Sequence, residues 1–299
     1  MTADPIFDRQ APIGVFDSGL GGLTVVSQIL RLLPQEQILF IADQAHVPYG
    51  GRDLSEVRGF ARGISEGLFG VGCKAIVMAC NISSATALHA VHVEHPDALV
   101  LGVIEPGGRA AAAMTQNGRI GILATVGTVH SGAYTRTLRA LDSQLFVQEV
   151  ACPDFVPLVE NDAMETPDAV RAAQTYLAPI LDSGIDTVVL GCTHYPFLLP
   201  VLQSVAPHLR FVNPAEQTVI EMAEALDVRC MAARGRERAS TCLATTGDAK
   251  HFAVQLRRFL PETALPVHFA AARWNAGQLT ITTSEPSGYQ TTNIHSAAR

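Results

Sequence analysis

The sequence predicts an α/β protein made of two doubly wound, pseudo-symmetric α/β domains that face each other across an active-site cleft. Apolar, strand-like runs alternate with helix-length segments along most of the chain, as in sheets covered by helices. An internal repeat aligns KAIVMACN (74 to 81) with DTVVLGCT (186 to 193), and IGVFDSG (13 to 19) with IGILATV (120 to 126). A glycine-rich turn also joins the first strand to the first helix.

The first half of the chain alternates predicted strands and helices. In order, these are a strand at 12–16, a helix through 25–33, a strand at 38–42, a helix at 53–69, and strands at 75–79 and 100–104. A loop from Asp43 to Gly51 follows the second strand. Ligands bind at the carboxyl ends of strands in open α/β sheets, so polar groups that follow these strands are expected at one sheet edge.

The turn Asp17-Ser18-Gly19-Leu20-Gly21-Gly22 predicts an anion site, because free backbone N–H groups point out of a helix start. A dinucleotide fingerprint fails, since Thr24 occupies the third glycine position. A small carboxylate can use the same turn, and a tight turn without a ligand is the alternative.

The second half repeats the alternation. In order, we expect a strand at 119–123, a turn at 125–128, a polar and apolar segment at 152–160, a helix at 166–181, a strand ending at Cys192, a helix through 219–226, a strand at 243–246 and a helix at 252–260. Thr166 followed by Pro167 is typical of a helix N-cap and first helical residue.

The domain organisation follows from where these elements return. Glu105-Pro106-Gly107-Gly108 ends the fourth strand and marks a domain crossing. We expect the first domain to contain residues 1–104 and 213–275, and the second residues 105–212. Residues 276–299, rich in Thr and Ser, are expected to form a C-terminal tail with an ordered edge at most.

Composition excludes several functional classes. A net charge of −7 and a pI near 5.8 argue against a nucleic-acid partner. No apolar run is long enough to span a membrane, and the N-terminus lacks the pattern of a signal peptide, so we expect a cytoplasmic protein. His89, His92 and His95 drift around a helix without carboxylate or thiol partners, so no metal site is predicted.

Cys80 and Cys192 are the candidate catalytic groups. Each ends an apolar strand near an expected helix start, where the helix dipole favours a thiolate, and each precedes a hydrogen-bonding residue, Asn81 or Thr193. If the two units face each other, the sulfurs can bracket one carbon. One thiolate then removes a proton while the other thiol donates one to the opposite face. An ordinary thiol pKa of about 8.5 allows either form.

A cofactor-free reaction is the better interpretation. Most enzymes that remove the α-proton of an amino acid use pyridoxal phosphate on a lysine. The only two lysines, Lys74 and Lys250, lie at a strand entry and in a late helix, which are poor Schiff-base positions. A disulfide between Cys80 and Cys192 would remove both bases and fits poorly with a reducing cytoplasm.

The motifs together resemble the glutamate racemases of the aspartate/glutamate racemase family. They are FDSGLGGL (16 to 23), VPYGG (47 to 51), ACN (79 to 81), GVIEPG (102 to 107), FVPLVE (155 to 160), LGCTHYP (190 to 196) and TTGD (245 to 248). The resemblance spans residues 13 to about 260 in the family's order. It implies cofactor-independent interconversion of L- and D-glutamate, which supplies D-glutamate for peptidoglycan, and a homodimer.

The resemblance also implies residue roles. Cys80 is expected to act on D-glutamate and Cys192 on L-glutamate, with Asp17 and His194 assisting the thiols and Glu160 as a nearby acidic group. The positions that the family uses for substrate contact correspond here to Asp17, Ser18, Tyr49, Gly50, Asn81, Ile82, Thr193 and His194.

Ile82 departs from the family's pattern, which usually has threonine after Cys-Asn. Its backbone N–H is kept, but the hydroxyl that helps to hold the substrate carboxylate is lost, and Ser83 offers a neighbouring one. A hydrogen bond to a charged group is worth about 1.5–3 kcal/mol. Three alternatives to glutamate racemisation therefore stay open: a racemase for aspartate or a modified acidic amino acid, a non-catalytic protein that binds acidic amino acids, and, more distantly, a nucleotide-binding protein.

Overall fold

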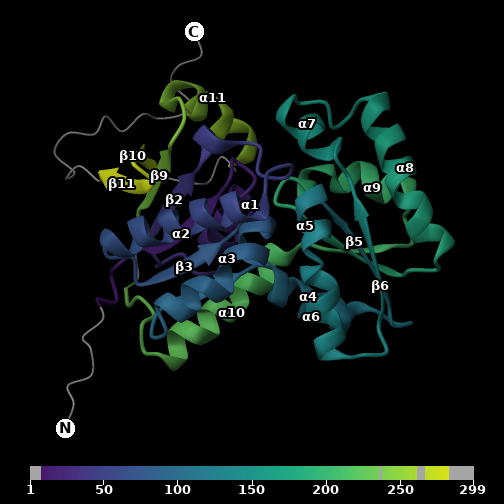
Figure 1. The fold of residues 1–299 in the computed structure, drawn as a ribbon, viewed down its shortest axis with the longest axis horizontal. Helices are drawn as coiled ribbons and strands as arrows, with labels where there is room; N and C mark the ends of the chain where they lie inside the picture. The colour runs from purple at the N-terminus through teal and green to yellow at the C-terminus, as the bar shows by residue number, and fades with distance from the viewer. Residues whose placement is uncertain (1–7, 236–237, 261–266, 283–299) are drawn as a thin grey trace.

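Two sheets, each covered by helices on both faces, form the two halves of the molecule (Figure 1). The structure is a computed structural model, and it describes residues 8–235, 238–260 and 267–282. This arrangement confirms the predicted α/β fold with two domains.

The first sheet has seven strands among the described residues, in the order β11-β10-β9-β2-β1-β3-β4. The strands are β1 Ile13–Asp17, β2 Ile38–Ala42, β3 Ala75–Met78, β4 Leu99–Gly102, β9 Thr241–Thr245, β10 Val267–Asn275 and β11 Gln278–Thr282. All neighbours are parallel except β10 and β11. The neighbouring strands β2, β1 and β3 are buried throughout, which explains their continuous apolar sequence.

Helices cover both faces of the first sheet. They are α1 Leu23–Leu32, α2 Leu54–Gly70, α3 Asn81–Glu94, α10 Pro214–Val228 and α11 Ala249–Phe259, with a 3₁₀ turn η1 at Gln44–His46. Along β1, Val15 packs in a core with α1 and α10, whereas Phe16 packs in the core with α2 and α3. Successive side chains on a strand point to opposite faces, so β1 contributes side chains to the hydrophobic cores on both faces of the sheet.

The second sheet has the order β6-β5-β7-β8, and all of its neighbouring strands are parallel. Its strands are β5 Arg119–Ala124, β6 Phe146–Ala151, β7 Thr187–Gly191 and β8 Arg210–Val212. Its helices are α4 Ile104–Met114, α5 Val126–Ser131, α6 Ala133–Leu141, α7 Phe155–Glu160, α8 Pro167–Asp182 and α9 Leu199–Val205, with a 3₁₀ turn η2 at Tyr195–Leu198.

The internal repeat is visible in the topology. The order β2-β1-β3-β4 in the first sheet matches β6-β5-β7-β8 in the second, and the two strands that precede Cys80 and Cys192, β3 and β7, occupy equivalent places. From the C-terminal segment, β9 pairs with β2 in the first sheet.

A predicted strand end and a predicted turn differ from the structure. The strand expected at 100–104 ends at Gly102, and Ile104 already begins α4. The turn expected at 125–128 is the first turn of α5, because the Thr125 side chain accepts a hydrogen bond from the Thr128 N–H and caps the helix.

The C-terminal hairpin extends the first sheet. Ala276 and Gly277 join β10 to β11 with φ angles of 47° and 81°, the positive values that a two-residue type I′ turn requires. Residues 276–282, in the range predicted as a tail with an ordered edge at most, form this turn and an edge strand. The rest of that predicted tail, 283–299, lies outside the described residues.

Candidate active site

A cavity of about 440 Å³ between the two domains is lined by both candidate catalytic cysteines, Cys80 and Cys192. Cys80 follows β3 of the first sheet, and Cys192 follows β7 of the second. Of the other predicted site residues, those that line the cavity are Ser18, Tyr49, Gly50, Asn81, Ile82, Glu160, Thr193 and His194. Asp17 is the one predicted site residue that does not line it.

Cys80 occupies the N-cap position of α3, and its carbonyl oxygen accepts a hydrogen bond from the Ser84 N–H. Only 5% of the residue is exposed. Burial, followed by the nearby Asp17 carboxylate, raises the pKa of the Cys80 thiol to about 12, although hydrogen bonds from Ser83 oppose the shift. The Cys80 sulfur is therefore a protonated thiol at neutral pH.

Cys192 lies beside a buried histidine. Its sulfur is 3.9 Å from His194 Nδ1, and His194 Nε2 is 3.4 Å from Glu160 Oε1. The second contact is within ion-pair range but is not aligned as a hydrogen bond, so Nε2 has no hydrogen-bond partner among the described residues. Cys192 is followed by the single 3₁₀ turn η2, not by the α-helix start that the sequence predicts.

His194 is a cation at neutral pH. Burial by itself would lower its pKa, but contacts with the Cys192 sulfur and the Glu160 carboxylate, and the charge of Asp17, outweigh burial and raise the pKa of His194 to about 10. The two thiols thus have different surroundings: the buried Asp17 carboxyl group is near Cys80, and the His194 imidazolium lies beside Cys192.

Asp17 lies behind the cavity wall and is fully buried. Its Oδ2 accepts hydrogen bonds from the backbone N–H of Gly22, at 2.8 Å, and from the Thr193 hydroxyl, at 3.2 Å. Burial raises the pKa of Asp17, while the charge of His194 and these hydrogen bonds oppose that shift. The glycine turn that predicted an anion site therefore holds the protein's own carboxylate.

The glycines of this turn allow the two domains to approach closely. A Cβ atom on Gly21 would lie 2.4 Å from Thr193 Oγ1 and 2.6 Å from His194 Nδ1, which no side chain can tolerate. A dinucleotide explanation of the turn is not needed, because contact between the domains accounts for the glycine.

The loop 43–51 forms a wall of the cavity through Tyr49 and Gly50. Tyr49 is 2% exposed, and its hydroxyl donates to Asp43 Oδ2 at 2.5 Å. The Gly50 carbonyl accepts a hydrogen bond from the Gly127 N–H of the second domain, at 2.9 Å. The loop therefore connects the two domains directly.

Asn81 and Ile82 begin α3 on the cavity wall. The Asn81 Oδ1 atom accepts a hydrogen bond from the Tyr134 hydroxyl at 2.7 Å, again across the domains. Ile82 is 3% exposed and packs with Tyr49 and Cys80. Its Cδ1 lies so close to Gly127 that a Cβ atom there would be only 2.4 Å away. Ile82 thus makes this part of the wall apolar.

Several cavity residues were missed by sequence reasoning about single positions. They are Val47, Pro48, Gly51, Thr125, Val126, Thr128, Cys152, Pro153, Val156, Pro157, Asn161 and Gly191. Most of them lie within the segments 47–51, 125–128 and 152–160, so membership of a motif was the available signal. Cys152 is a third thiol in the cavity, and burial raises its pKa. Its carbonyl oxygen accepts a hydrogen bond from Tyr195.

Two histidines of the series His89, His92 and His95 make polar contacts within the protein. His92 contacts the Val100 carbonyl oxygen, and His95 contacts Glu66. Within the described residues, no cluster of three or more His, Cys, Asp or Glu side chains could hold a metal ion.

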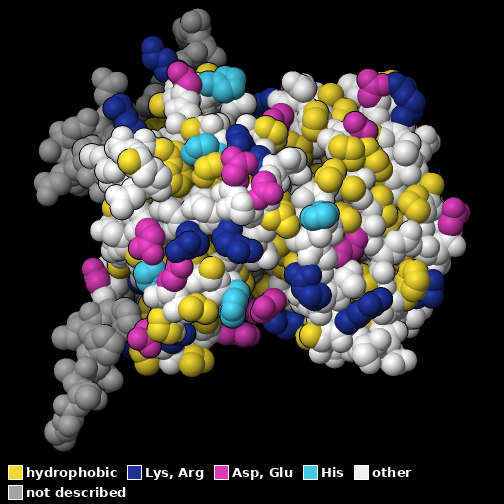
Figure 2. Space-filling model, in the orientation of Figure 1, with side chains coloured by type: hydrophobic (Ala, Val, Ile, Leu, Met, Phe, Trp, Pro, Cys, Tyr) yellow, Lys and Arg dark blue, Asp and Glu magenta, His cyan; other side chains and the backbone are white. Residues whose placement is uncertain are grey.

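No helix in the described part of the chain is long and apolar enough to cross a membrane. On the face shown in Figure 2, basic and acidic side chains lie interspersed.

The chain is similar in sequence to known racemases. Residues 13–225 match the Asp/Glu/Hydantoin racemase family. A glutamate racemase from Shouchella clausii is 40% identical over 241 residues, which cover 81% of this chain and 87% of that protein.

Two solved structures share the fold over nearly the whole chain. A glutamate racemase from Bacillus anthracis has a TM-score of 0.83 and 35% identity, covering 91% of this chain and 100% of the other. A glutamate racemase from Francisella tularensis, solved in complex with D-glutamate, has a TM-score of 0.82 and 26% identity, covering 90% and 98% of the two chains.

Proposed function

This chain belongs to the Asp/Glu/Hydantoin racemase family, and from that membership and its paired thiols we infer that it is a glutamate racemase. It interconverts L-glutamate and D-glutamate without a cofactor and supplies D-glutamate for peptidoglycan. The observation that carries this function is that Cys80 and Cys192, from equivalent strands of two related domains, line one cavity.

The reaction is a two-base inversion. From L-glutamate, the Cys192 thiolate removes the α-proton, and the Cys80 thiol gives its own proton to the opposite face of the carbanion. D-glutamate leaves with Cys192 protonated and Cys80 as the thiolate, which is the state from which the reverse reaction starts. No net proton is gained or lost.

The surroundings of each sulfur suit this sequence. His194 places positive charge beside Cys192, where a contact ion pair with a thiolate can form. The raised pKa of Cys80 keeps it protonated as the donor and makes its thiolate a strong base when the direction reverses. Glu160 and Asp17 act as positioning residues through His194 and Thr193.

Substrate binding uses the groups that line the cavity near the start of α3. The backbone N–H of Ile82 and the side chains of Ser18, Asn81 and Thr193 offer hydrogen bonds to the two carboxylates and the ammonium group. Tyr49 and Gly50 supply the wall on the side of the first domain.

The test replaces each thiol separately. Cys80→Ser and Cys192→Ser should each abolish racemisation, because a serine hydroxyl is too weak an acid and base at this carbon. Circular dichroism follows the change of handedness, and proton NMR in deuterated buffer follows loss of the α-proton signal. Cys242→Ser, outside the cavity, is the matched control and should racemise normally. Normal turnover in both cavity variants would refute the mechanism.

An altered substrate preference within the same chemistry is favoured by the apolar wall at Ile82. A panel of L-glutamate, L-aspartate and modified acidic amino acids, tested by the same α-proton exchange, distinguishes a glutamate racemase from a racemase with another preferred substrate. Exchange that is faster with another substrate than with glutamate would favour this candidate, and binding without exchange would indicate a binding protein.

We further propose a cytoplasmic homodimer, with a first domain of residues 1–104 and 213–275 and a second of 105–212. Free thiols in the site are compatible with a reducing compartment. Sedimentation equilibrium measures the assembly, and a monomer at micromolar concentration would exclude the dimer.

A further inference from the structure

The C-terminal hairpin of β10 and β11 packs tightly on α2, and glycines make this possible. A Cβ atom on Gly63 would lie 2.8 Å from Trp274 Cζ3, and one on Gly67 would lie 2.9 Å from the Leu279 carbonyl oxygen. The hairpin lies beyond residue 225, where the family match ends. It nevertheless reaches the edge of the cavity loop.

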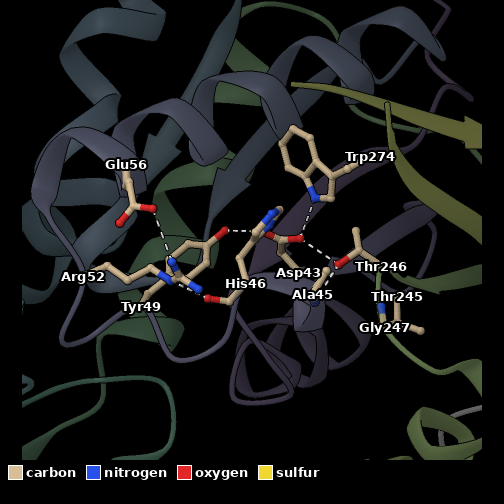
Figure 3. Close-up of polar contacts among 10 residues, drawn as sticks. All are labelled: Asp43, Ala45, His46, Tyr49, Arg52, Glu56, Thr245, Thr246, Gly247 and Trp274. Carbon is tan, nitrogen blue, oxygen red and sulfur yellow. Dashed lines mark hydrogen bonds and ion pairs between the residues drawn. The ribbon is translucent and has the colours of Figure 1, made fainter. Parts of the chain in front are cut away.

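Trp274 of the hairpin donates its indole N–H to Asp43 Oδ1 at 2.7 Å (Figure 3). The same oxygen accepts a hydrogen bond from the Thr246 hydroxyl at 2.7 Å. The other carboxylate oxygen accepts from the Tyr49 hydroxyl at 2.5 Å and lies 2.9 Å from His46 Nδ1. Asp43 is fully buried, so these four partners, not water, satisfy its carboxylate oxygens.

The aromatic packing around this carboxylate also runs from the hairpin to the loop. The His46 ring stacks on Phe60 of α2, with centroids 3.9 Å apart, and meets the edge of Trp274 at 5.2 Å. Trp274 therefore contacts the loop both through Asp43 and through His46.

We propose that Trp274 is a positioning residue for the substrate loop 43–51. This inference rests on the glutamate racemase function proposed above. Through Asp43, the indole N–H fixes the carboxylate that holds the Tyr49 hydroxyl, and Tyr49 and Gly50 line the cavity. The hairpin thus sets how well the loop is organised to bind substrate.

The chemistry of the donor explains why a tryptophan suits this position. An indole N–H can only donate, so it matches a carboxylate that can only accept. If the indole N–H is removed, Asp43 Oδ1 keeps a single hydrogen-bond donor, Thr246. Because the site is buried, a carboxylate with too few donors shifts towards the partners that remain, which changes their positions. Tyr49 is one of those partners.

The test compares Trp274→Phe with Ile281→Ala. Phenylalanine keeps an aromatic ring against Gly63 but removes the N–H. Ile281 is a buried residue of the same hairpin that packs in the core with α2 and makes no hydrogen bond to Asp43. Trp274→Phe should raise KM for both enantiomers about fivefold and leave kcat within about twofold. The substitution weakens the order of the loop before substrate binds, and this order contributes to binding and not to the chemical step. Ile281→Ala should lower the midpoint of thermal unfolding without raising KM.

Two outcomes would overturn the proposal. An unchanged KM in Trp274→Phe would show that the N–H does not order the loop. An equal rise in KM in both variants would show that only hairpin stability matters. If the wild-type protein itself fails to turn over glutamate, the proposed function fails instead, so the two failures are distinguishable.

A measurement without substrate tests the same coupling. Trp274 is the only tryptophan in the sequence, so intrinsic fluorescence excited at the indole reports on this residue alone. Tyr49→Phe removes a hydroxyl from Asp43 and should shift the Trp274 emission, whereas Ile281→Ala should not. Identical emission in wild type and Tyr49→Phe would contradict the coupling of Trp274 to the loop.

Discussion

At the scale of single residues, the two thiols differ because each has a different charged neighbour. Cys80 is buried near an aspartate, and Cys192 lies next to a histidine that is a cation at neutral pH. In the mechanism proposed above, the same residue type serves as acid at one face of the substrate and as base at the other. This asymmetry is set by surroundings that come from both domains.

The asymmetry predicts an order of alkylation. Only thiolates react with iodoacetamide, so at pH 8 Cys80, with a pKa of about 12, should react slowly, whereas Cys192 beside the His194 cation should react first. The rate at Cys80 should rise steadily as the pH increases towards 12. Mass spectrometry of tryptic peptides after short exposure measures each site. Faster labelling of Cys80 than of Cys192 at pH 8 would contradict the raised pKa of Cys80.

Ile82 offers a second test at this scale. Ile82→Thr restores a hydroxyl at the cavity wall and should lower KM for glutamate by about tenfold, the equivalent of a hydrogen bond worth about 1.4 kcal/mol. It should also cost about 1 kcal/mol of unfolding free energy, since packing against Gly127 is lost.

The control for this substitution is Ile82→Val, which trims the same side chain without adding a hydroxyl. It should cost a similar amount of unfolding free energy, about 0.5–1.5 kcal/mol, and leave KM unchanged. Denaturant unfolding and steady-state kinetics give both quantities. Equal KM values for the threonine and valine variants would mean that the hydroxyl has no role in binding.

At the scale of elements, α2 carries glycines with two different environments. Gly67 lies against the hairpin, whereas a Cβ atom on Gly59 would meet nothing within 4 Å. Alanine is a better helix former than glycine by about 1 kcal/mol. The net effect of Gly→Ala should therefore depend on which face of the helix is substituted.

Gly59→Ala should raise the free energy of unfolding by up to about 1 kcal/mol. Gly67→Ala should lower it, because the new methyl group presses on the backbone of Leu279, which cannot move without displacing β11. Urea denaturation of both variants provides the comparison. A stabilised Gly67→Ala variant would show that the hairpin is not packed on α2 as described here.

Some of the strands and helix starts were predictable from sequence at this scale. The strand Ile38–Ala42 and the helix capped by Thr166 agree with prediction, because both depend on local apolar period and local capping chemistry. The turn at 125–128 was mispredicted, since whether Thr125 caps a helix depends on how the following residues pack. The strand Phe146–Ala151 was not identified, and its exposed and half-buried residues explain the weak apolar signal.

At the scale of the whole molecule, contacts between the domains build the site. Gly50 accepts a hydrogen bond from Gly127, Asn81 accepts one from Tyr134, and Asp17 accepts one from Thr193. Each pairs a residue of the first sheet's domain with one of the second. Any relative movement of the domains would change the distance between the thiols and the substrate loop together.

The sequence alone determined the duplicated α/β architecture, the two cysteine-ended strands and the chemistry that paired thiols allow. These features depend on residue type and on spacing along the chain, which a sequence states directly. Only the tertiary structure decided that Asp17 lies behind the cavity, that Ile82 packs over Gly127, and that Trp274 bonds Asp43 across 231 residues of chain. Contacts between residues so far apart leave no periodic pattern, because they are fixed by how complete sheets and helices pack in space.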